Sequence, residues 1–287
     1  WSRIFPDPTD SLSSYDDLKG AANPRALDHY HAVFTSLRRR GLEPFVTLNH
    51  YTLPVWIHDG VACHQDLSTC SARGWLDRER VVREIAKFAA FCGREFGGEV
   101  DLWATLNEPL AVVLPGYIYP SPERSNPPAL LLRLPEARTA LVAMIEAHAR
   151  MYDAVKTNDV WDADGDRTDA RVGIVYNMAP FRAKNPSRTL DVTAAENAYY
   201  IWNSVFLNAI TRGGLDDDLD GIPSPRPDLA GRTDFIGINY YTRATIEGMA
   251  AALLPEFSPL TTFNPASIQP WEDYPKGISE LVRAVRS

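Results

Sequence analysis

The sequence predicts an α/β fold of the (β/α)8 TIM-barrel type, folded as a single domain. Short apolar runs alternate with longer amphipathic stretches along the 287 residues, which indicates repeated strand–helix units. Polar and aromatic residues stand where successive strand-like runs end, and no G-x-G-x-x-G turn for a dinucleotide occurs. In a barrel, the carboxyl ends of the strands meet at one mouth, where active sites are built. The pattern therefore favours a barrel over a doubly wound sheet.

Five strand-like runs, each followed by a helix-like stretch, account for most of the chain. The first long helix has the clearest local signals, because Asn23 and Pro24 form a cap and first-turn pair and Gly41 stands at its expected end. The strand-like runs are short and apolar, as in parallel sheets, and cover Trp1–Phe5, Glu43–His50, Val100–Asn107, Val172–Tyr176 and Phe235–Asn239. Further helices are predicted at Glu79–Phe96, Pro135–Val155, Val192–Ile210 and Lys276–Val285.

Charge and hydropathy exclude several classes of partner. The net charge is −8, so no basic surplus exists to neutralise the phosphates of a nucleic acid. No apolar run approaches the length of a membrane span. We therefore expect neither a nucleic-acid nor a membrane partner. We expect a cytoplasmic protein, for which a homo-oligomer is one option.

The three cysteines give little support for a metal site. Cys63, His64 and Cys70 lie close together, but their spacing fits no common zinc pattern and a fourth ligand is missing. Three cysteines, including Cys92, are also too few for a disulfide framework. We interpret this segment as an ordinary loop.

Two acidic stretches have calcium binding as an alternative interpretation. Asp216–Gly221 matches the first half of an EF-hand loop, but Pro227 stands where the bidentate Glu is required. Asp162–Asp166 is followed by Arg167 instead of the required glycine. We expect both stretches to be solvated loops without a metal.

Glu108 is the strongest candidate for a catalytic group. It follows a buried strand and precedes Pro109, which lacks an N–H and turns the chain outward. A carboxyl group near apolar walls and a second carboxylate keeps its proton to higher pH than one in water. Splitting a glycosidic bond requires such an acid beside the leaving oxygen and a second carboxylate on the sugar's other side. Asn107 offers hydrogen bonds to a sugar hydroxyl.

Polar residues at other strand ends favour the same site. Arg3 could keep a carboxylate ionised, and His50 and Tyr241 supply further hydrogen-bond donors. Each has an ordinary alternative: Arg3 as an ion-pair partner, His50 as a core histidine, Tyr240 and Tyr241 as strand residues. Their joint placement at strand ends favours one polar cluster at the mouth of the barrel.

These residues lie in segments that resemble glycoside hydrolase family 1, the retaining β-glycosidases that include β-glucosidases and β-galactosidases. The segments follow the family's order over nearly the whole chain and comprise Trp1–Pro6, Glu43–His50 with Leu53-Pro54, Gly74–Leu76, Thr105–Pro109, Gly116-Tyr117, Ala147–Ala149 and Asp234–Thr242. The loop Asp59–Arg73 and the stretch Trp271–Gly277 look most like the archaeal-type branch.

The resemblance implies roles on the substrate side of the site. Glu108 matches the family's acid/base, and Asn107 matches the residue that binds the sugar 2-hydroxyl. His50 matches the histidine that contacts hydroxyls of the glycon. Tyr51 stands where many members have tryptophan, so it should keep an aromatic wall while changing the contacts to the glycon.

The resemblance also implies a second carboxylate that these residues do not supply. Arg3 and Tyr241 match groups that orient and ionise the family's nucleophile, and Asn239 supports the same place. That nucleophile lies in an Ile/Val-Thr-Glu-Asn-Gly motif, which is absent from the sequence. We expect the chain to cover roughly strands two to six of a longer barrel, with the nucleophile outside it, and the 287 residues alone to be inactive.

The implied activity is hydrolysis of small β-glycosides or oligosaccharides by an exo-acting, two-carboxylate double displacement, which needs no metal and no cofactor. Two alternatives stay open. One is a non-catalytic carbohydrate-binding barrel, and the other is a 6-phospho-β-glycosidase. The exact sugar and aglycone are not determined by the sequence.

Overall fold

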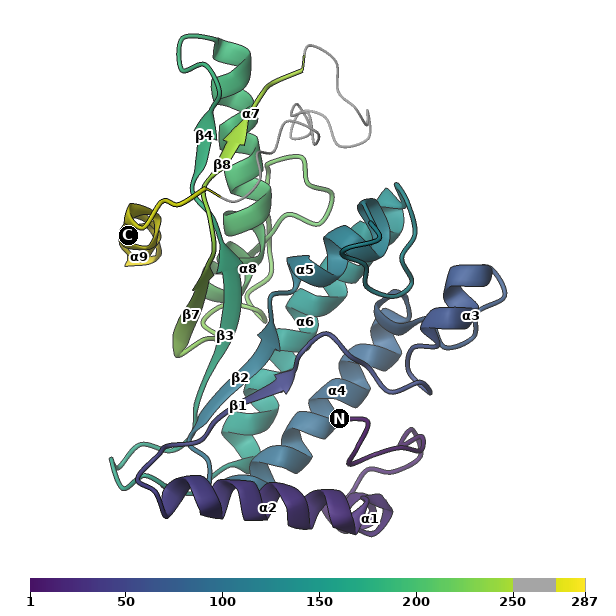
Figure 1. Ribbon diagram of the computed structural model, residues 1–287. Coiled ribbons are helices and arrows are strands. Elements are labelled where there is room, and N and C mark those ends of the chain that lie inside the picture. The colour runs from purple at the N-terminus through teal and green to yellow at the C-terminus, as the bar shows by residue number, and fades with distance from the viewer. Residues whose placement is uncertain (250–271, 287) are drawn as a thin grey trace. The chain divides into compact units, whose positions relative to one another are not determined.

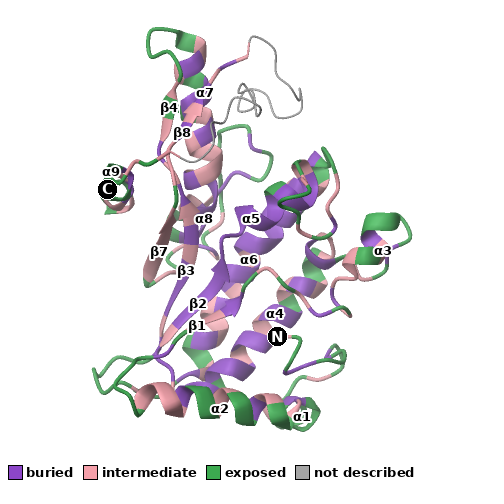
Figure 2. Cartoon of the chain, viewed as in Figure 1, coloured by how far each residue is buried: buried purple, intermediate pink, exposed green. Residues whose placement is uncertain are grey.

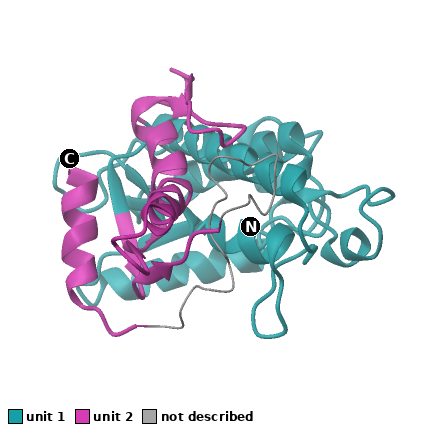
Figure 3. Ribbon diagram, turned by 90° about the horizontal axis from the view of Figure 1, so that it is seen from above, with its two compact units in different colours: residues 1–175, 232–236 teal, residues 176–231, 237–287 magenta. Residues whose placement is uncertain are grey.

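The computed structural model describes residues 1–249 and 272–286, which divide into two compact units. Unit 1 consists of residues 1–175 and 232–236, and unit 2 of residues 176–231 and 237–287 (Figure 3). The prediction of one domain over residues 1–287 stays a prediction. Trp271, part of the resemblance to the archaeal-type branch, lies outside the described residues.

Parallel strands form the centre of unit 1. The strand β1 (Phe45–Asn49) pairs in parallel with β2 (Leu102–Asn107), which pairs in parallel with β3 (Arg171–Met178). In the described residues, the four-stranded sheet has the order β1-β2-β3-β7, where β7 is Phe235–Tyr240. Four of the five strand predictions are therefore confirmed, and the chain has the predicted α/β architecture.

Two long helices of unit 1 pack beside this sheet (Figure 1). The helix α4 (Arg78–Phe96) contacts α6 (Leu134–Asn158), and α6 also contacts β2. Figure 2 shows that β2 and much of α6 are buried. Because β2 is buried on both faces from Trp103 to Asn107, apolar residues do not alternate with exposed polar residues along it. In the described part of the chain, no helix is long and apolar enough to cross a membrane.

The first long helix forms where its local signals place it. In α2 (Pro24–Arg38), the side chain of Asn23 accepts a hydrogen bond from the backbone N–H of Arg25 at 3.1 Å. This cap satisfies one of the backbone donors that a helix leaves unpaired at its start. Gly41, with φ +70°, takes the left-handed conformation that ends a helix readily.

The strand predicted at Trp1–Phe5 was wrong, because this segment is a turn. The backbone N–H groups of Ile4 and Phe5 both donate to the carbonyl of Trp1 at 3.0 Å. Ile4 and Phe5 are buried, and the aromatic rings of the segment pack on α4 instead of in a sheet: the ring of Trp1 stacks on Phe88, and Phe5 contacts Phe88 edge-on. An apolar run shows that a segment is buried, but here packing on a helix determines its conformation.

A disulfide links Cys63 to Cys70, so the interpretation of this segment as an ordinary loop missed a covalent bond. The short helix α3 (Gly60–Gln65) ends in a turn that brings the two Cα atoms to 4.9 Å, a separation that a disulfide can bridge. Cys92 is a free, buried cysteine. The remaining short elements of unit 1 are α1 (Tyr15–Ala21), η1 (Gly74–Leu76), α5 (Leu110–Val113) and η2 (Leu114–Ile118).

Unit 2 contains the helix predicted at Val192–Ile210, but with a π-helical interruption. It runs as α7 (Thr189–Tyr199), η3 (Tyr200–Ser204) and α8 (Val205–Arg212). Asn203, within η3, donates to the carbonyl and accepts from the N–H of Ala179. The other elements of this unit are β4 (Phe181–Ala183), β5 (Gly214–Leu215), β6 (Ser224–Pro225), β8 (Ala244–Ile246) and α9 (Lys276–Arg286).

Candidate functional site

The carboxyl ends of β1 and β2 bring four of the candidate residues together. Asn49 lies opposite Leu106 in the parallel pairing of these strands. The residues that follow, His50 and Tyr51 on one strand and Asn107 and Glu108 on the other, are therefore neighbours, although 57 positions separate Tyr51 from Glu108.

A chain of hydrogen bonds connects these four side chains. The hydroxyl of Tyr51 donates to Oε2 of Glu108 at 2.8 Å, and it accepts from Nδ2 of Asn107 at 3.0 Å. The same amide nitrogen lies 3.4 Å from Nε2 of His50. Because an amide nitrogen only donates, Nε2 of His50 is the acceptor in this contact. The sequence placed these residues in one site but did not reveal the bond from Tyr51 to Glu108.

The backbone holds Glu108 in an unusual conformation. Its φ is +46°, in the left-handed region that residues other than glycine seldom adopt. Its N–H donates to the carbonyl of Val175 at 2.8 Å, and its carbonyl accepts from Ala111 at 2.9 Å. The register between β2 and β3 shifts immediately before it, between Ala104 and Asn107. Glu108 is 2% exposed, so the carboxyl group is buried. Strained backbone of this kind is concentrated at functional sites.

Thr105 and His148 form a buried layer next to this site. The hydroxyl of Thr105 lies 2.6 Å from Nδ1 of His148, and Nε2 of His148 lies 2.6 Å from the carbonyl of Arg232. A carbonyl only accepts, so Nε2 donates to it and Nδ1 accepts from Thr105. Burial lowers the pKa of His148 to about 4, so the ring is neutral at neutral pH. Thr105 and His148 lie in segments of the family resemblance, but their contact was not predicted.

Three further residues were expected to orient the nucleophile. Arg3 is exposed in the N-terminal turn of unit 1. In the described residues of that unit, it is not part of the hydrogen-bonded group around Glu108. Asn239 and Tyr241 belong to unit 2, in β7 and just after its end, and the side chain of Tyr241 is exposed. Their role stays a prediction.

Three groups of carboxylates among the described residues have oxygens within 4.8 Å of one another. In the EF-hand-like stretch, Asp216 is buried and not solvated as expected, and its oxygens accept from Tyr200, Asp220 and Gly221. It therefore organises its own loop. The second group is Asp162, Asp164 and Asp166, and the third is Glu43, Asp101 and Asp164.

Cationic side chains accompany the third group of carboxylates, which lies at the amino ends of β1 and β2. Arg38 lies 3.7 Å from Asp101, and Arg171 lies 3.6 Å from Asp164. These guanidinium groups neutralise part of the negative charge that would otherwise attract a metal cation. We assign no metal to any of the three groups.

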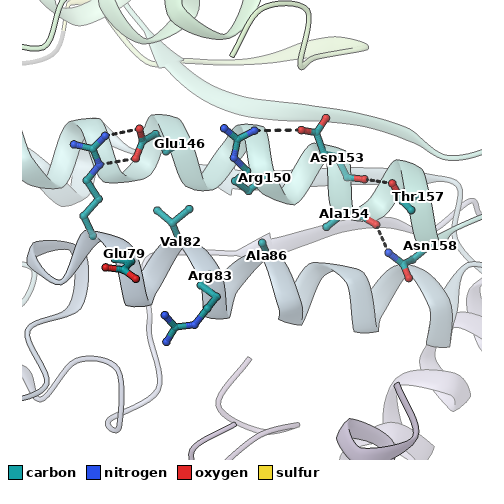
Figure 4. A pocket seen from close by; sticks show the side chains of 11 residues that line it. Glu79, Val82, Arg83, Ala86, Glu146, Arg150, Asp153, Ala154, Thr157 and Asn158 are labelled. Carbon is teal, nitrogen blue, oxygen red and sulfur yellow. Dashed lines mark hydrogen bonds and ion pairs between the residues drawn. The ribbon is translucent and has the colours of Figure 1, made fainter. Parts of the chain in front are cut away.

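An open groove of about 880 Å³ runs between α4 and α6 (Figure 4). Ion pairs between arginine and carboxylate side chains line its sides, such as Arg78 with Glu146 and Arg150 with Asp153. Val82, from α4, contributes an apolar side chain between them. None of the four residues at the strand ends lines this groove, so we place the candidate active site at the strand ends.

Fold and site together define a class of protein. Functional side chains gathered at the carboxyl ends of parallel strands, as Glu108 and its neighbours are, are the arrangement of (β/α)8-barrel enzymes. The family model described as glycosyl hydrolase family 1 matches residues 1–287. The chain belongs to this family, and its structure is part of a (β/α)8 barrel.

Individual relatives agree with this assignment. The chain is 35% identical to a β-galactosidase of Pyrococcus woesei over 98% of its own length and 62% of that protein's. It is 33% identical to a β-galactosidase of Saccharolobus solfataricus, over 86% of its own length and 50% of that protein's. Among solved structures, the β-glycosidase of Thermosphaera aggregans matches 99% of the chain and 61% of its own chain, with 26% identity and a TM-score of 0.80. The chain thus spans about half to three fifths of these relatives, and the predicted archaeal-type relationship is confirmed.

Proposed function

We propose that the complete protein is a retaining, exo-acting β-glycosidase that hydrolyses β-D-glucosides and β-D-galactosides, with Glu108 as its acid/base. One observation carries this proposal. In a chain of glycosyl hydrolase family 1, Glu108 is buried at the carboxyl end of β2 and is hydrogen-bonded within a group of sugar-binding residue types. Relatives named β-galactosidase and others named β-glucosidase support both sugars as substrates.

The proposed reaction has two steps. In the first, Glu108 gives its proton to the glycosidic oxygen while a second carboxylate, outside residues 1–287, attacks the anomeric carbon from the opposite face. The bond to the aglycone breaks, and a glycosyl-enzyme forms. In the second step, the Glu108 carboxylate takes a proton from water. The resulting hydroxide equivalent displaces the nucleophile from the anomeric carbon and releases the sugar with its original configuration.

The neighbouring side chains are suited to hold the sugar during both steps. Asn107 offers an amide to the 2-hydroxyl, where hydrogen bonds strengthen in the transition state. His50 is exposed at the end of β1 and offers its imidazole to other glycon hydroxyls. We propose that these two residues bind the glycon and that the ring of Tyr51 forms an aromatic wall beside it.

A panel of nitrophenyl β-glycosides on the full-length protein tests this function. We expect hydrolysis of the glucoside and galactoside, and a loss of about 10²- to 10⁴-fold in Glu108→Ala, the usual contribution of an acid/base group. With a dinitrophenyl glycoside, whose leaving group needs no proton, azide should restore turnover of Glu108→Ala and give a β-glycosyl azide. Glu79→Ala, an exposed glutamate in the first turn of α4, is the matched control.

The same panel separates the alternatives. Turnover confined to 6-phosphoglycosides would indicate a phosphoglycosidase instead. Glycoside binding without any turnover would indicate a carbohydrate-binding barrel. Full activity of Glu108→Ala would contradict the role of Glu108.

A further inference from the structure

Tyr51 and Glu108 share a feature that the proposed function does not explain. Both have left-handed backbones, with φ +71° at Tyr51 and +46° at Glu108. Two nearby bonds hold the turn at Tyr51: Nδ2 of Asn49 donates to the carbonyl of Thr52, and the N–H of Thr52 donates to the carbonyl of His50, each at 2.9 Å. This turn directs the phenol towards the carboxyl group of Glu108. Conformations of this kind persist only where the surrounding structure enforces them.

Two hydrogen bonds of the phenol have opposite polarity. Its oxygen accepts from Nδ2 of Asn107 at 3.0 Å, and its O–H donates to Oε2 of Glu108 at 2.8 Å. A hydroxyl group can do both at once, whereas the indole of tryptophan only donates and phenylalanine does neither. Of phenylalanine, tryptophan and tyrosine, tyrosine is thus the residue that can link Asn107 to Glu108 through its side chain.

We propose that Tyr51 is a positioning residue: its hydroxyl fixes the orientation of the Glu108 carboxyl group by donating a hydrogen bond to it. This inference rests on the proposed function, because it assigns to Tyr51 a part in the acid/base step. A hydrogen bond donated to a carboxylate stabilises its ionised form. Without the hydroxyl, the ionised carboxyl group of Glu108 loses one stabilising hydrogen bond, and its two oxygens lose a fixed direction.

An aromatic wall alone predicts a different behaviour. If the ring of Tyr51 only packed against the sugar, Tyr51→Phe would leave the pH dependence unchanged, because the ring remains. If the hydroxyl positions Glu108, Tyr51→Phe instead slows the steps in which Glu108 transfers a proton. Substrates with poor leaving groups should then suffer more than substrates whose leaving group departs without protonation.

The experiment compares the full-length wild type with Tyr51→Phe and Tyr51→Trp in kcat/KM profiles from pH 4 to 10. For Tyr51→Phe, we expect the alkaline limb to move up by about one pH unit, a shift typical of one hydrogen bond. We expect kcat/KM to fall about tenfold for alkyl β-glucosides and to change little for a dinitrophenyl glucoside. Tyr51→Trp retains a donor but cannot accept from Asn107, so its alkaline limb should move by less than that of Tyr51→Phe, and it provides a second reading if the Phe variant folds poorly.

Tyr30→Phe is the matched control, since Tyr30 lies on α2 and packs its ring on Phe34 and Phe96. It should behave as the wild type. Superimposable pH profiles of the wild type and folded Tyr51→Phe overturn this inference alone. An inactive wild type overturns the proposed function and this inference with it.

Discussion

His148 is the buried polar residue whose surroundings most clearly fix its charge. Both ring nitrogens have partners within unit 1, the carbonyl of Arg232 and the hydroxyl of Thr105. A proton on Nδ1 would remove the acceptor that Thr105 uses, and burial disfavours the charged ring in any case. These contacts tie the helix α6 to the strand that carries Asn107 and Glu108.

We expect acid to destabilise the protein through His148. Burial lowers the pKa of its imidazole to about 4 in the folded state, against about 6.5 when unfolded. Between these values the unfolded chain binds more protons, so stability rises with pH. The neutral ring's contribution to the free energy of unfolding is complete above pH ~6.5. It is lost as the pH falls towards ~4, by roughly 3 kcal/mol in total.

Urea unfolding midpoints of the full-length protein at pH 7.5 and 5 provide the measurement. His148→Gln should be less stable at pH 7.5 but should show a smaller loss between the two pH values. His29→Gln, on α2, is the control and should follow the wild type. Parallel losses in wild type and His148→Gln would contradict the assignment.

At the scale of elements, close backbone approach explains why a glycine interrupts the apolar strand β3. A Cβ atom at Gly173 would lie 2.2 Å from the carbonyl oxygen of Phe235 and 2.7 Å from its ring. Real Cβ atoms do not come this close to backbone, so any side chain would force the strands apart. The sequence shows the glycine but not its neighbour.

Gly173→Ala should therefore destabilise the full-length protein by about 1–3 kcal/mol or more, the usual cost of overpacking a core. Gly20→Ala is the matched substitution, since Gly20 lies within α1 and has nothing within 4 Å of its Cβ position. Because alanine favours a helix over glycine, that variant should be slightly more stable than the wild type. Thermal unfolding of both variants tests the contrast, and equal melting temperatures would refute it.

At the scale of the whole molecule, the catalytic carboxyl groups that residues 1–287 contain determine whether these residues can hydrolyse a glycoside. A retaining mechanism needs two carboxyl groups on opposite sides of the sugar. The described site offers Glu108 at the end of β2, and the sequence lacks the motif that carries the family's nucleophile. The relatives are longer than this chain, which covers 62% of the Pyrococcus woesei protein.

We expect the isolated polypeptide of residues 1–287 to show no hydrolysis of nitrophenyl β-glucoside above background, whereas the full-length protein is active. Without a nucleophile the glycosyl-enzyme cannot form. Circular dichroism of the same sample reports whether the polypeptide is folded. Turnover by the isolated polypeptide that disappears in Glu108→Gln would show that the second carboxylate lies within it.

Local signals predicted much of the fold. Asn23 and Pro24 begin α2, and the apolar run before Glu108 forms β2, because caps and periodicity depend on neighbouring residues alone. The predictions that failed concern how side chains meet after the backbone has folded, in one case across the sequence and in the other over seven positions. Trp1–Phe5 is a turn because its rings pack on α4, and Cys63 bonds to Cys70 because a turn brings them together.

The sequence by itself determined the alternation of strands and helices, the family, and the position of Glu108 at a strand end. Only the tertiary structure decided that the hydroxyl of Tyr51 meets the carboxyl group of Glu108, across 57 positions of sequence. Periodicity is a property of the local backbone. This contact, in contrast, depends on the register of β1 against β2 and on two left-handed residues at their ends.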